Sequence, residues 1–395
     1  MKKKTIRDID VDGKKVLLRV DFNVPMDDKG NITDDSRIKA CLPTIRYLID
    51  NGARLIICSH LGRPVGKVVE GLRLAPVVQR LSELLGRPVK VVRESIGPDV
   101  ETAVANLKKG DILLLENIRF HPEEEANDRD FARALARLAD VFVNDAFGVS
   151  HRSHASVVGV AQYLPAVAGF LMEKEIEALS GALENPKRPF AAILGGAKVS
   201  GKIAVLENIV DKVDALLIGG GMAATFLKSM GCDVGKSKVE DDKLDYVRRL
   251  RKKMESRGVK LLLPRDLVVA GKLEAGADTR TVPVSELSDG FIIGDIGPET
   301  VEEFSRELSK CKTVIWNGPM GVFEIPEFAS GTRSLIKVLA KLKAVTVIGG
   351  GSTAEAVVEA GLADKMSHVS TGGGASLEFL EGKTLPGVAA LQDKQ

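Results

Sequence analysis

The sequence contains little cysteine, and this scarcity excludes disulfide-rich scaffolds and zinc-binding modules. Four of the 395 residues are cysteine, namely Cys41, Cys58, Cys232 and Cys311. They lie far apart with no CxxC pair, so we expect free thiols in a reducing compartment. Cys58 and Cys311 lie in or beside apolar runs, which favours packing over nucleophilic catalysis.

Aromatic rings, excess charge and long apolar runs are scarce as well. Aromatic residues make up 4% of the chain and the formal net charge is +2, which argues against a nucleic-acid surface. No apolar run approaches the roughly 18 to 20 residues of a membrane span, and no signal-peptide core follows the basic N-terminal stretch. We therefore expect a cytoplasmic protein with neither nucleic acid nor membrane as a partner.

What the chain does contain is an alternation of apolar, β-branched runs with helix-period segments, which is typical of parallel α/β architecture. The sequence predicts strands at 16–20, 54–59, 89–92, 112–116 and 141–145, and then at 191–194, 215–218, 260–263, 313–316, 345–348 and 368–371.

The length of the chain indicates two domains, since one ordinary core covers roughly 100–200 residues. Pro186 and Pro189 should stop a helix-like segment, LMEKEIEAL, between the halves. We predict two doubly wound parallel-sheet (Rossmann-like) domains, separated by a cleft and joined by a helix at 171–185. The first domain would cover 1–170 and the second 186–376.

Ligands of open α/β sheets bind beyond the carboxyl ends of the strands, and in the first half these positions are polar or cationic. The residues are Asp21, Asn23, His60, Arg63, Arg119 and Arg152, with Arg37 in a turn-like segment. A lone arginine is usually a surface charge, but four guanidinium groups near strand ends favour a small polyanionic ligand.

His151 and His154 form an HxxH pair, which raises the alternative of a metal site. No thiolate or carboxylate stands at a matching spacing, so hydrogen bonding to an anion or to the loop is favoured.

In the second half the strands end in glycine, in LGGAKVSGK, IGGGMAATF, IGGGSTAEA and STGGGASLE. Glycine lets backbone N–H groups approach phosphate oxygens, and a following helix adds the positive end of its dipole. Gly349–Gly351 is thus predicted to seat a phosphate, with hydroxyls placed where they could cap the next helix.

Two motifs match only in part. Gly196–Lys202 is like a P-loop, but Ile203 replaces the Ser or Thr that would hold Mg²⁺. Gly219–Ala224 and Gly349–Ala354 each fit GxGxxA, the looser form of the dinucleotide-binding motif. That motif also needs an acidic residue at the end of a strand about 20 residues further on, to bind the ribose. No such residue follows Gly349, and Glu240 and Asp241, which follow Gly219, have no apolar strand before them. A nicotinamide-dependent oxidoreductase is an alternative with little support, and a noncatalytic anion-binding protein is another.

Nine long motifs share their pattern with one family. They are LLRVDFNVP, DDSRIKACLPTI, CSHLGRP, LENIRFHPEEEAND, NDAFGVSHRSHAS, GGAKVSGK, GGGMAATFL, VIWNGPMGVFE and STGGGASLEFLEGKTLPG. Over essentially its whole length the sequence resembles phosphoglycerate kinases. The resemblance implies reversible transfer of the acyl phosphate of 1,3-bisphosphoglycerate to ADP, giving 3-phosphoglycerate and ATP with Mg²⁺ in glycolysis and gluconeogenesis, by a monomer.

The resemblance also implies the site residues. The family's phosphoglycerate site corresponds to Asp21, Asn23, Arg37, His60, Arg63, Arg119 and Arg152. Its nucleotide site corresponds to Gly219 and Gly220 beside the adenine, Lys198 and Lys202 toward the phosphates, Glu324 toward the ribose, and Gly294, Asn317, Gly350, Gly351, Ser352 and Thr353. The family's final segment, 377–395 here, returns to the first domain.

One position departs from the family pattern, because Ser352 stands where the family usually has an aspartate that helps to place the metal. A hydroxyl brings no charge to a hard cation that prefers carboxylate oxygen. We therefore expect Mg²⁺ to arrive chiefly on the phosphates of the nucleotide, with another carboxylate or waters completing its shell, and the sequence does not identify the protein ligand.

The implied reaction needs no general base, since a carboxylate and an ADP oxygen are ionised near neutral pH. Catalysis would come from in-line positioning and from cations around the moving phosphoryl group. We assign Arg37 to the acyl-phosphate end and Lys198 to the equatorial oxygens of the moving group. The N–H groups near Gly373 and Gly374 would act as fixed dipoles that stabilise its charge. Closure of the domains would bring the reactants together.

Overall fold

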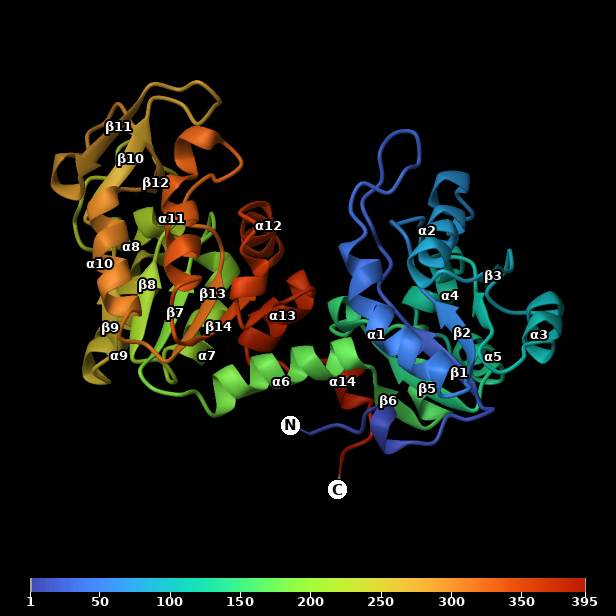
Figure 1. Ribbon diagram of the computed structural model, residues 1–395. Helices are drawn as coiled ribbons and strands as arrows, with labels where there is room; N and C mark the ends of the chain where they lie inside the picture. The colour runs from blue at the N-terminus through green and yellow to red at the C-terminus, as the bar shows by residue number, and fades with distance from the viewer. Residues whose placement is uncertain (1, 395) are drawn as a thin grey trace. The chain divides into compact units, whose positions relative to one another are not determined.

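The computed structural model describes residues 2–394, which form two compact units (Figure 1). Unit 1 extends to Glu177 and takes in the segment from Thr384 onward, while unit 2 runs from Ala178 to Lys383. The division falls inside helix α6 (Phe170–Glu184). Among the described residues, no helix is long and apolar enough to cross a membrane.

Unit 1 is built on a six-stranded parallel sheet with the order β3-β4-β2-β1-β5-β6. Its strands are β1 (Lys15–Arg19), β2 (Arg54–Cys58), β3 (Lys90–Val91), β4 (Ile112–Leu114), β5 (Val141–Asn144) and β6 (Ala166–Ala168). Successive residues of β1, Val16, Leu17 and Leu18, are all fully buried. Both faces of the sheet are therefore covered, as expected of parallel strands.

Helices and short turns connect these strands and cover the sheet. The helices are α1 (Ser36–Asp50), α2 (Ala75–Leu85), α3 (Pro98–Ala105), α4 (Pro122–Glu125), α5 (Arg129–Ala136) and α14 (Pro386–Ala389). Phe131 and Leu135 of α5 are buried, so the predicted apolar face of that helix forms. Asp128 begins α5 by accepting from the N–H groups of Asp130 and Phe131, each at 2.9 Å.

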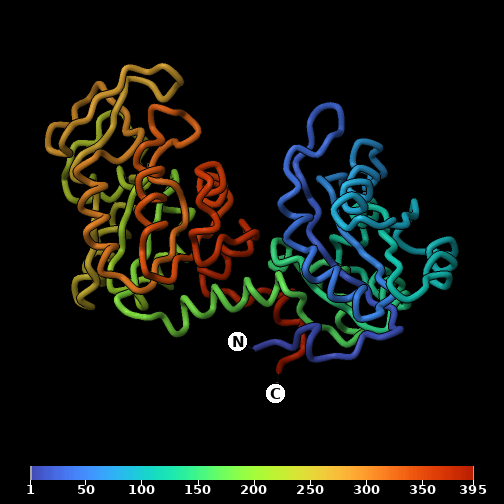
Figure 2. Tube along the Cα trace, in the orientation of Figure 1, coloured from blue at the N-terminus to red at the C-terminus, as the bar shows by residue number. Residues whose placement is uncertain are grey.

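The C-terminal segment lies beside the N-terminal segment in unit 1 (Figure 2). Lys3 and Asp393 form an antiparallel bridge, and the Lys4 N–H donates to the Gln392 carbonyl at 2.8 Å. The Gly387 N–H also donates to the Ser150 carbonyl at 2.8 Å. The last helix is thus fixed against the loop that follows β5.

Unit 2 contains a second six-stranded parallel sheet, with the order β15-β14-β13-β7-β8-β9. Its strands are β7 (Phe190–Leu194), β8 (Ala215–Ile218), β9 (Lys260–Leu262), β13 (Thr313–Asn317), β14 (Val345–Gly349) and β15 (His368–Val369). Trp316 of β13 is fully buried, and its indole N–H donates to the Gly318 carbonyl at 2.7 Å. That bond fixes the turn at the carboxyl end of β13.

The helices of unit 2 begin just beyond several of these strand ends (Figure 1). They are α7 (Ile203–Ile209), α8 (Met222–Ser229), α9 (Leu244–Ser256), α10 (Pro298–Leu308), α11 (Ser330–Leu339), α12 (Gly351–Glu359) and α13 (Gly373–Leu380). The glycine clusters predicted from the sequence therefore lie between a strand and a helix N-terminus.

A three-stranded antiparallel sheet in unit 2 is the main feature that the sequence analysis missed. It consists of β10 (Asp266–Ala270), β11 (Thr279–Pro283) and β12 (Ile292–Ile296), in the order β11-β10-β12. All eleven predicted strands form in the parallel sheets, with ends shifted by one or two residues, whereas β6 and these three strands were not predicted. The fold class, two doubly wound parallel sheets, is confirmed.

Candidate functional sites

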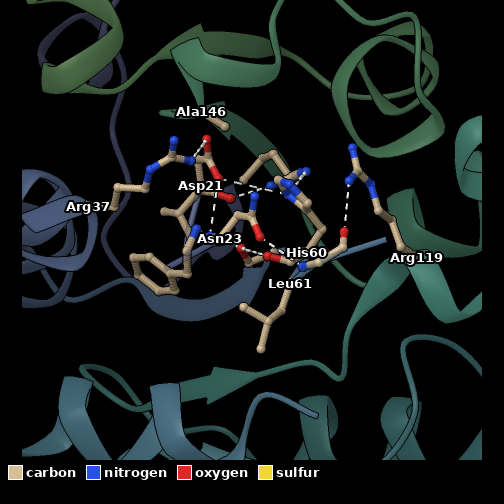
Figure 3. Close-up of polar contacts among 12 residues, drawn as sticks. Asp21, Asn23, Arg37, His60, Leu61, Arg119 and Ala146 are labelled. Atoms are coloured by element: carbon tan, nitrogen blue, oxygen red, sulfur yellow. Dashed lines mark hydrogen bonds and ion pairs between the residues drawn. The ribbon is translucent and has the colours of Figure 1, made fainter. Parts of the chain in front are cut away.

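Polar side chains from several elements of unit 1 meet at the carboxyl ends of β1 and β2 (Figure 3). An Arg37 guanidinium nitrogen donates to Asp21 Oδ2 at 2.7 Å, and the Asn23 N–H donates to Asp21 Oδ1 at 3.2 Å. Asn23 Oδ1 accepts from the Gly62 N–H at 2.8 Å, and Arg119 donates to the Gly62 carbonyl at 3.0 Å. We call Asp21, Asn23, Arg37, His60 and Arg119 together the acid-site cluster.

Arg37, Asp21, Asn23, His60 and Arg119 were all predicted as site residues, and the structure brings them together. Arg63 and Arg152 differ, because both are exposed and neither guanidinium group makes a hydrogen bond or ion pair within residues 2–394. Their guanidinium groups therefore have all of their donors available for a ligand.

Burial governs the protonation of the histidines in this region. The ring of His60 is buried beside Arg19 and Arg119, and desolvation together with these cations holds its pKa well below the ordinary value. Desolvation, with Arg119 and Arg19 nearby, likewise lowers the pKa of His154 to about 4. Both rings are therefore neutral at pH 7, which argues against histidine cations as the anion-binding charges.

The glycine loops of unit 2 pack against one another at the carboxyl ends of β7, β8 and β13. The N–H groups of Gly195 and Gly196 donate to the carbonyls of Asn317 and Pro319, at 3.0 and 3.2 Å. Gly220 has φ +67°, and a Cβ there would lie 2.6 Å from the Gly196 nitrogen. Only glycine fits this contact, so the loops can approach closely enough to form one wall.

A pocket of about 550 Å³ opens beside these loops. Four of the predicted nucleotide residues line it, namely Gly220, Gly294, Glu324 and Ser352. Ile293, Val322 and Leu273 supply apolar surface suited to an adenine ring. Gly219 is packed behind the pocket, because a Cβ there would lie 2.4 Å from the Met320 sulfur.

The pocket also has lining residues that the sequence analysis missed. Lys236, Ser237 and Lys238 line it from the segment between α8 and α9. Two lysines in the short run VGKSK were the available signal, but the run follows no strand, and the analysis considered only strand ends.

Two helix N-termini meet beside the predicted phosphate seat. Helix α12 begins at Gly351 and α13 at Gly373, and a Cβ on Gly373 would lie 3.5 Å from the Gly351 nitrogen. Ser376 Oγ joins them, accepting from the Gly350 N–H at 3.3 Å and donating to the Gly373 carbonyl at 3.1 Å. The positive ends of both helix dipoles thus point to one region.

The hydroxyls that follow Gly351 do not cap helix α12, contrary to the sequence-based expectation. Gly350 is the N-cap, with φ +90° and no side-chain cap bond. Thr353 is buried, and its Oγ1 accepts from the Gly318 N–H at 2.7 Å, which ties the α12 loop to the β13 loop. Ser352 is exposed on the first turn of the helix.

Lysine side chains near the phosphate seat differ in their environment. Lys202 is largely buried with its ammonium on Asn317 Oδ1, and desolvation lowers its pKa to about 8. Asn317 Nδ2 is buried and has no partner within residues 2–394. Lys198 is exposed and makes no hydrogen bond or ion pair in the same range, so no contact fixes it beside Lys202 and Asn317.

The described residues contain no preformed side-chain cage for a metal ion. Residues 2–394 contain no group of three or more His, Cys, Asp or Glu side chains that could hold a metal ion. In unit 1, the HxxH alternative offers the His154 ring beside Glu124, with Nδ1 3.8 Å from Oε1. In unit 2, Ser352 offers only an exposed hydroxyl. Hard divalent cations need several oxygen ligands, which the Ser352 hydroxyl does not supply by itself.

Comparison with known proteins gives the same family throughout. A family model described as phosphoglycerate kinase matches residues 6–383. The chain is 59% identical over 394 residues to a phosphoglycerate kinase of Pelotomaculum thermopropionicum and 57% identical over 394 residues to one of Moorella thermoacetica. Both alignments cover 100% of this chain and 100% of the relative. It is similar to the solved phosphoglycerate kinases of Coxiella burnetii (TM-score 0.90, 42% identity) and Pyrococcus horikoshii (TM-score 0.85, 36% identity), with 98% of both chains covered in each case.

The buried ammonium of Lys202 generates a prediction about pH. With its pKa at about 8, Lys202 is cationic below that pH and neutral above it. We expect the Kd for ADP to rise about tenfold between pH 7 and pH 9, since a charge-assisted bond to phosphate is lost. Calorimetric titration measures this rise, and Lys202→Arg should remove most of it because guanidinium stays charged.

Lys228→Arg is the matched control, because Lys228 is a partly exposed lysine of the same unit that pairs with Asp241. It should show the same rise as the natural chain. A pH-independent Kd in the natural chain would contradict this role for Lys202.

Proposed function

Because the chain belongs to the phosphoglycerate kinase family, we propose that unit 1 binds the phosphoglycerate and unit 2 binds the nucleotide during the reaction of that family. The reaction is reversible transfer of the acyl phosphate of 1,3-bisphosphoglycerate to ADP, which gives 3-phosphoglycerate and ATP in glycolysis. The protein is a phosphotransferase whose acceptor, in the direction of ATP consumption, is a carboxyl group.

The observation that carries this division is the contrast between the two sets of strand ends. In unit 1 they present guanidinium groups, with Arg37 at 2.7 Å from Asp21 and with Arg63 and Arg152 unpaired within residues 2–394. In unit 2 the strand ends lead into glycine loops and helix N-termini, which lie beside a pocket with apolar walls. Guanidinium suits the carboxylate and phosphate of a small acid, whereas glycine loops and apolar walls suit a nucleotide.

In unit 1, Asp21 acts as the organiser of the acid site. Its carboxylate holds Arg37 and accepts from the Asn23 N–H, so two side chains that contact the acid are fixed before it arrives. Arg119 is fixed through the Gly62 carbonyl. Preorganised cations reduce the free energy spent on ordering the site, and Arg37 is assigned to the acyl-phosphate end.

In unit 2, Lys202 and the N–H groups at Gly351–Thr353 and at Gly373 and Gly374 would hold the nucleotide phosphates, whereas the predicted Gly350 N–H already donates to Ser376 Oγ. Gly294 and Gly220 would approach the base and Glu324 the ribose. The exposed Lys198 would reach the equatorial oxygens of the moving group, which requires a flexible, unpaired ammonium such as it has. The reaction needs no general base, since both reacting oxygens are ionised.

Mg²⁺ would enter with the nucleotide, as part of the substrate rather than as a resident cofactor. The lack of a carboxylate at Ser352 supports this, as does the lack of a cluster of three or more His, Cys, Asp or Glu side chains within residues 2–394. The four free cysteines support a reducing, cytoplasmic location. The oxidoreductase alternative is not favoured, since the family is that of a phosphotransferase.

Replacing Arg37 tests the acid site. Arg37→Ala should lower kcat/KM for 3-phosphoglycerate about 100-fold, because a preorganised cation at the developing charge is lost. A coupled assay of ADP formation from ATP and 3-phosphoglycerate gives this value. Arg46→Ala, which removes an exposed arginine of the same helix, should stay within about twofold. Equal losses in the two variants would refute the assigned role.

Replacing Ser352 tests the metal argument. Ser352→Asp adds a carboxylate beside the phosphate seat, so half-maximal activity should need about fivefold less free Mg²⁺, since one added ion contact near the surface is worth about 1 kcal/mol. The same assay with Mg²⁺ varied at fixed nucleotide measures it. Ser352→Asn, similar in size but uncharged, is the matched control. An unchanged Mg²⁺ dependence in Ser352→Asp would show that the account of this position is wrong.

A further inference from the structure

A buried polar network lies behind the acid-site cluster and involves residues that no site prediction included. Arg19, Glu124 and Ser156 are each 0% exposed. Arg19 Nε donates to Ser156 Oγ at 2.8 Å, and Ser156 Oγ donates to Glu124 Oε1 at 2.7 Å. The Ser156 N–H donates to Glu124 Oε2 at 2.9 Å. The cation and the carboxylate are thus linked through one hydroxyl.

Arg19 differs from the arginines of the acid site, because its donors are used inside the protein. Besides Ser156, it donates to the Val20 carbonyl, and its remaining nitrogen lies 3.2 Å from His60 Nδ1. A fully buried guanidinium held on three sides cannot turn toward a ligand without breaking these bonds. Arg19 would therefore act on a ligand through a neighbour, and the neighbour that belongs to the acid-site cluster is His60.

The contact between Arg19 and His60 determines where the imidazole carries its proton. Guanidinium has only N–H donors, so His60 Nδ1 has to accept, and the ring proton is on Nε2. The competing partner is Asp21, but its Oδ1 lies 3.9 Å from Nδ1, too far for a hydrogen bond. Asp21 Oδ2 is already taken by Arg37.

The other charged groups around His60 favour the same state. Arg119, Arg37 and His154 all act with Arg19 against an imidazolium, and burial opposes it most strongly. Asp21, with Oδ1 3.9 Å from His60 Nδ1, is a carboxylate that would favour the cation. Within residues 2–394, no group of the chain accepts a bond from His60 Nε2, so that N–H is left for the ligand.

We propose that Arg19 is a positioning residue that locks His60 in the Nε2–H tautomer, so that the ring offers phosphoglycerate one hydrogen-bond donor and no charge. Glu124, through Ser156, fixes the guanidinium that does this. The proposal rests on the proposed role of His60 in binding the acid. On this proposal the arginines balance the negative charge of the substrate, while the neutral His60 ring orients the substrate through one hydrogen bond. That hydrogen bond does not depend on pH near neutrality.

The tautomer can be read in the natural protein. With ¹⁵N-labelled histidine, long-range ¹H–¹⁵N correlation separates the tautomers of the five histidines, and His60→Gln assigns the signal of His60. We expect the Nε2–H pattern for His60, unchanged from pH 6 to pH 8. An Nδ1–H pattern, or an imidazolium that titrates in this range, would overturn the proposal.

Removal of Arg19 gives the second test. In Arg19→Met, His60 Nδ1 loses the donor that makes it an acceptor, while burial still keeps the ring neutral. The ¹H–¹⁵N correlation should then show the Nδ1–H tautomer beside the Nε2–H tautomer, and the KM for 3-phosphoglycerate should rise about fivefold because the ring no longer offers a fixed donor. Arg54→Lys is the matched control, since Arg54 donates to the Gly13 carbonyl at the opposite end of the same sheet, and it should keep the natural tautomer and KM.

The double variant Arg19→Met, Glu124→Gln covers the case in which an unpaired Glu124 prevents folding of the single variant, and it should show the same change of tautomer. A purely structural role would raise KM while His60 keeps the Nε2–H pattern, which would overturn the proposal. Separately, if His60→Gln leaves KM unchanged, the binding role of His60 fails, while the tautomer measured by NMR stands or falls by itself.

Discussion

Repulsion between two anions is the constraint to which the polar groups of this protein respond. A phosphoglycerate and a nucleoside diphosphate each carry several negative charges, and transfer of a phosphoryl group between them has to offset that repulsion with fixed positive groups. Unit 1 supplies full charges on guanidinium groups. Unit 2 supplies mostly partial charges, in the N–H groups at the starts of α12 and α13, with Lys202 beside them.

Positive groups attract ligands only if the protein has not already neutralised them, and the chain separates the two kinds of cation clearly. Arg19 is balanced inside the protein through Ser156 and Glu124, whereas Arg63 and Arg152 are exposed and unpaired within residues 2–394. Arg37 is intermediate, because Asp21 holds one nitrogen and leaves the others available. Burial thus distinguishes the arginine that is bonded inside the protein from those whose guanidinium groups are available to a ligand.

Much of this arrangement could be predicted from the sequence, and the failures have physical reasons. Continuous apolar runs predicted the eleven parallel strands because both faces of such strands are buried. Of the three antiparallel strands that were missed, β11 is mostly exposed and β12 is interrupted by Gly294 and Asp295, whereas the apolar run DLVVA of β10 was a signal that the sequence analysis passed over. The capping role expected of the hydroxyls after Gly351 was wrong, since Gly350 at φ +90° begins the helix without a side chain. The role of Thr353 depends on a loop 35 residues away, which no local pattern records.

The site residues themselves came from motifs, but their division into ligands and supports did not. Arg19 is only two residues from Asp21 in RVDFN, and nothing in that spacing shows that each guanidinium nitrogen of Arg19 has a partner inside the protein. Those partners follow from the place of Arg19 at the end of β1, between β2 and β5. Glu124 and Ser156 lie in segments far from β1 in sequence, so their link to Arg19 is a product of the fold.

The most direct test of the account is backbone hydrogen exchange measured by mass spectrometry on the full chain, with 3-phosphoglycerate alone and with ADP alone. We predict that 3-phosphoglycerate slows exchange at residues 20–24, 60–63 and 118–121 of unit 1. ADP should slow exchange at residues 219–222, 350–353 and 373–376 of unit 2, each with little effect on the other set. Protection of the unit 1 strand ends by ADP, or of the unit 2 glycine loops by 3-phosphoglycerate, would contradict the division of binding between the units.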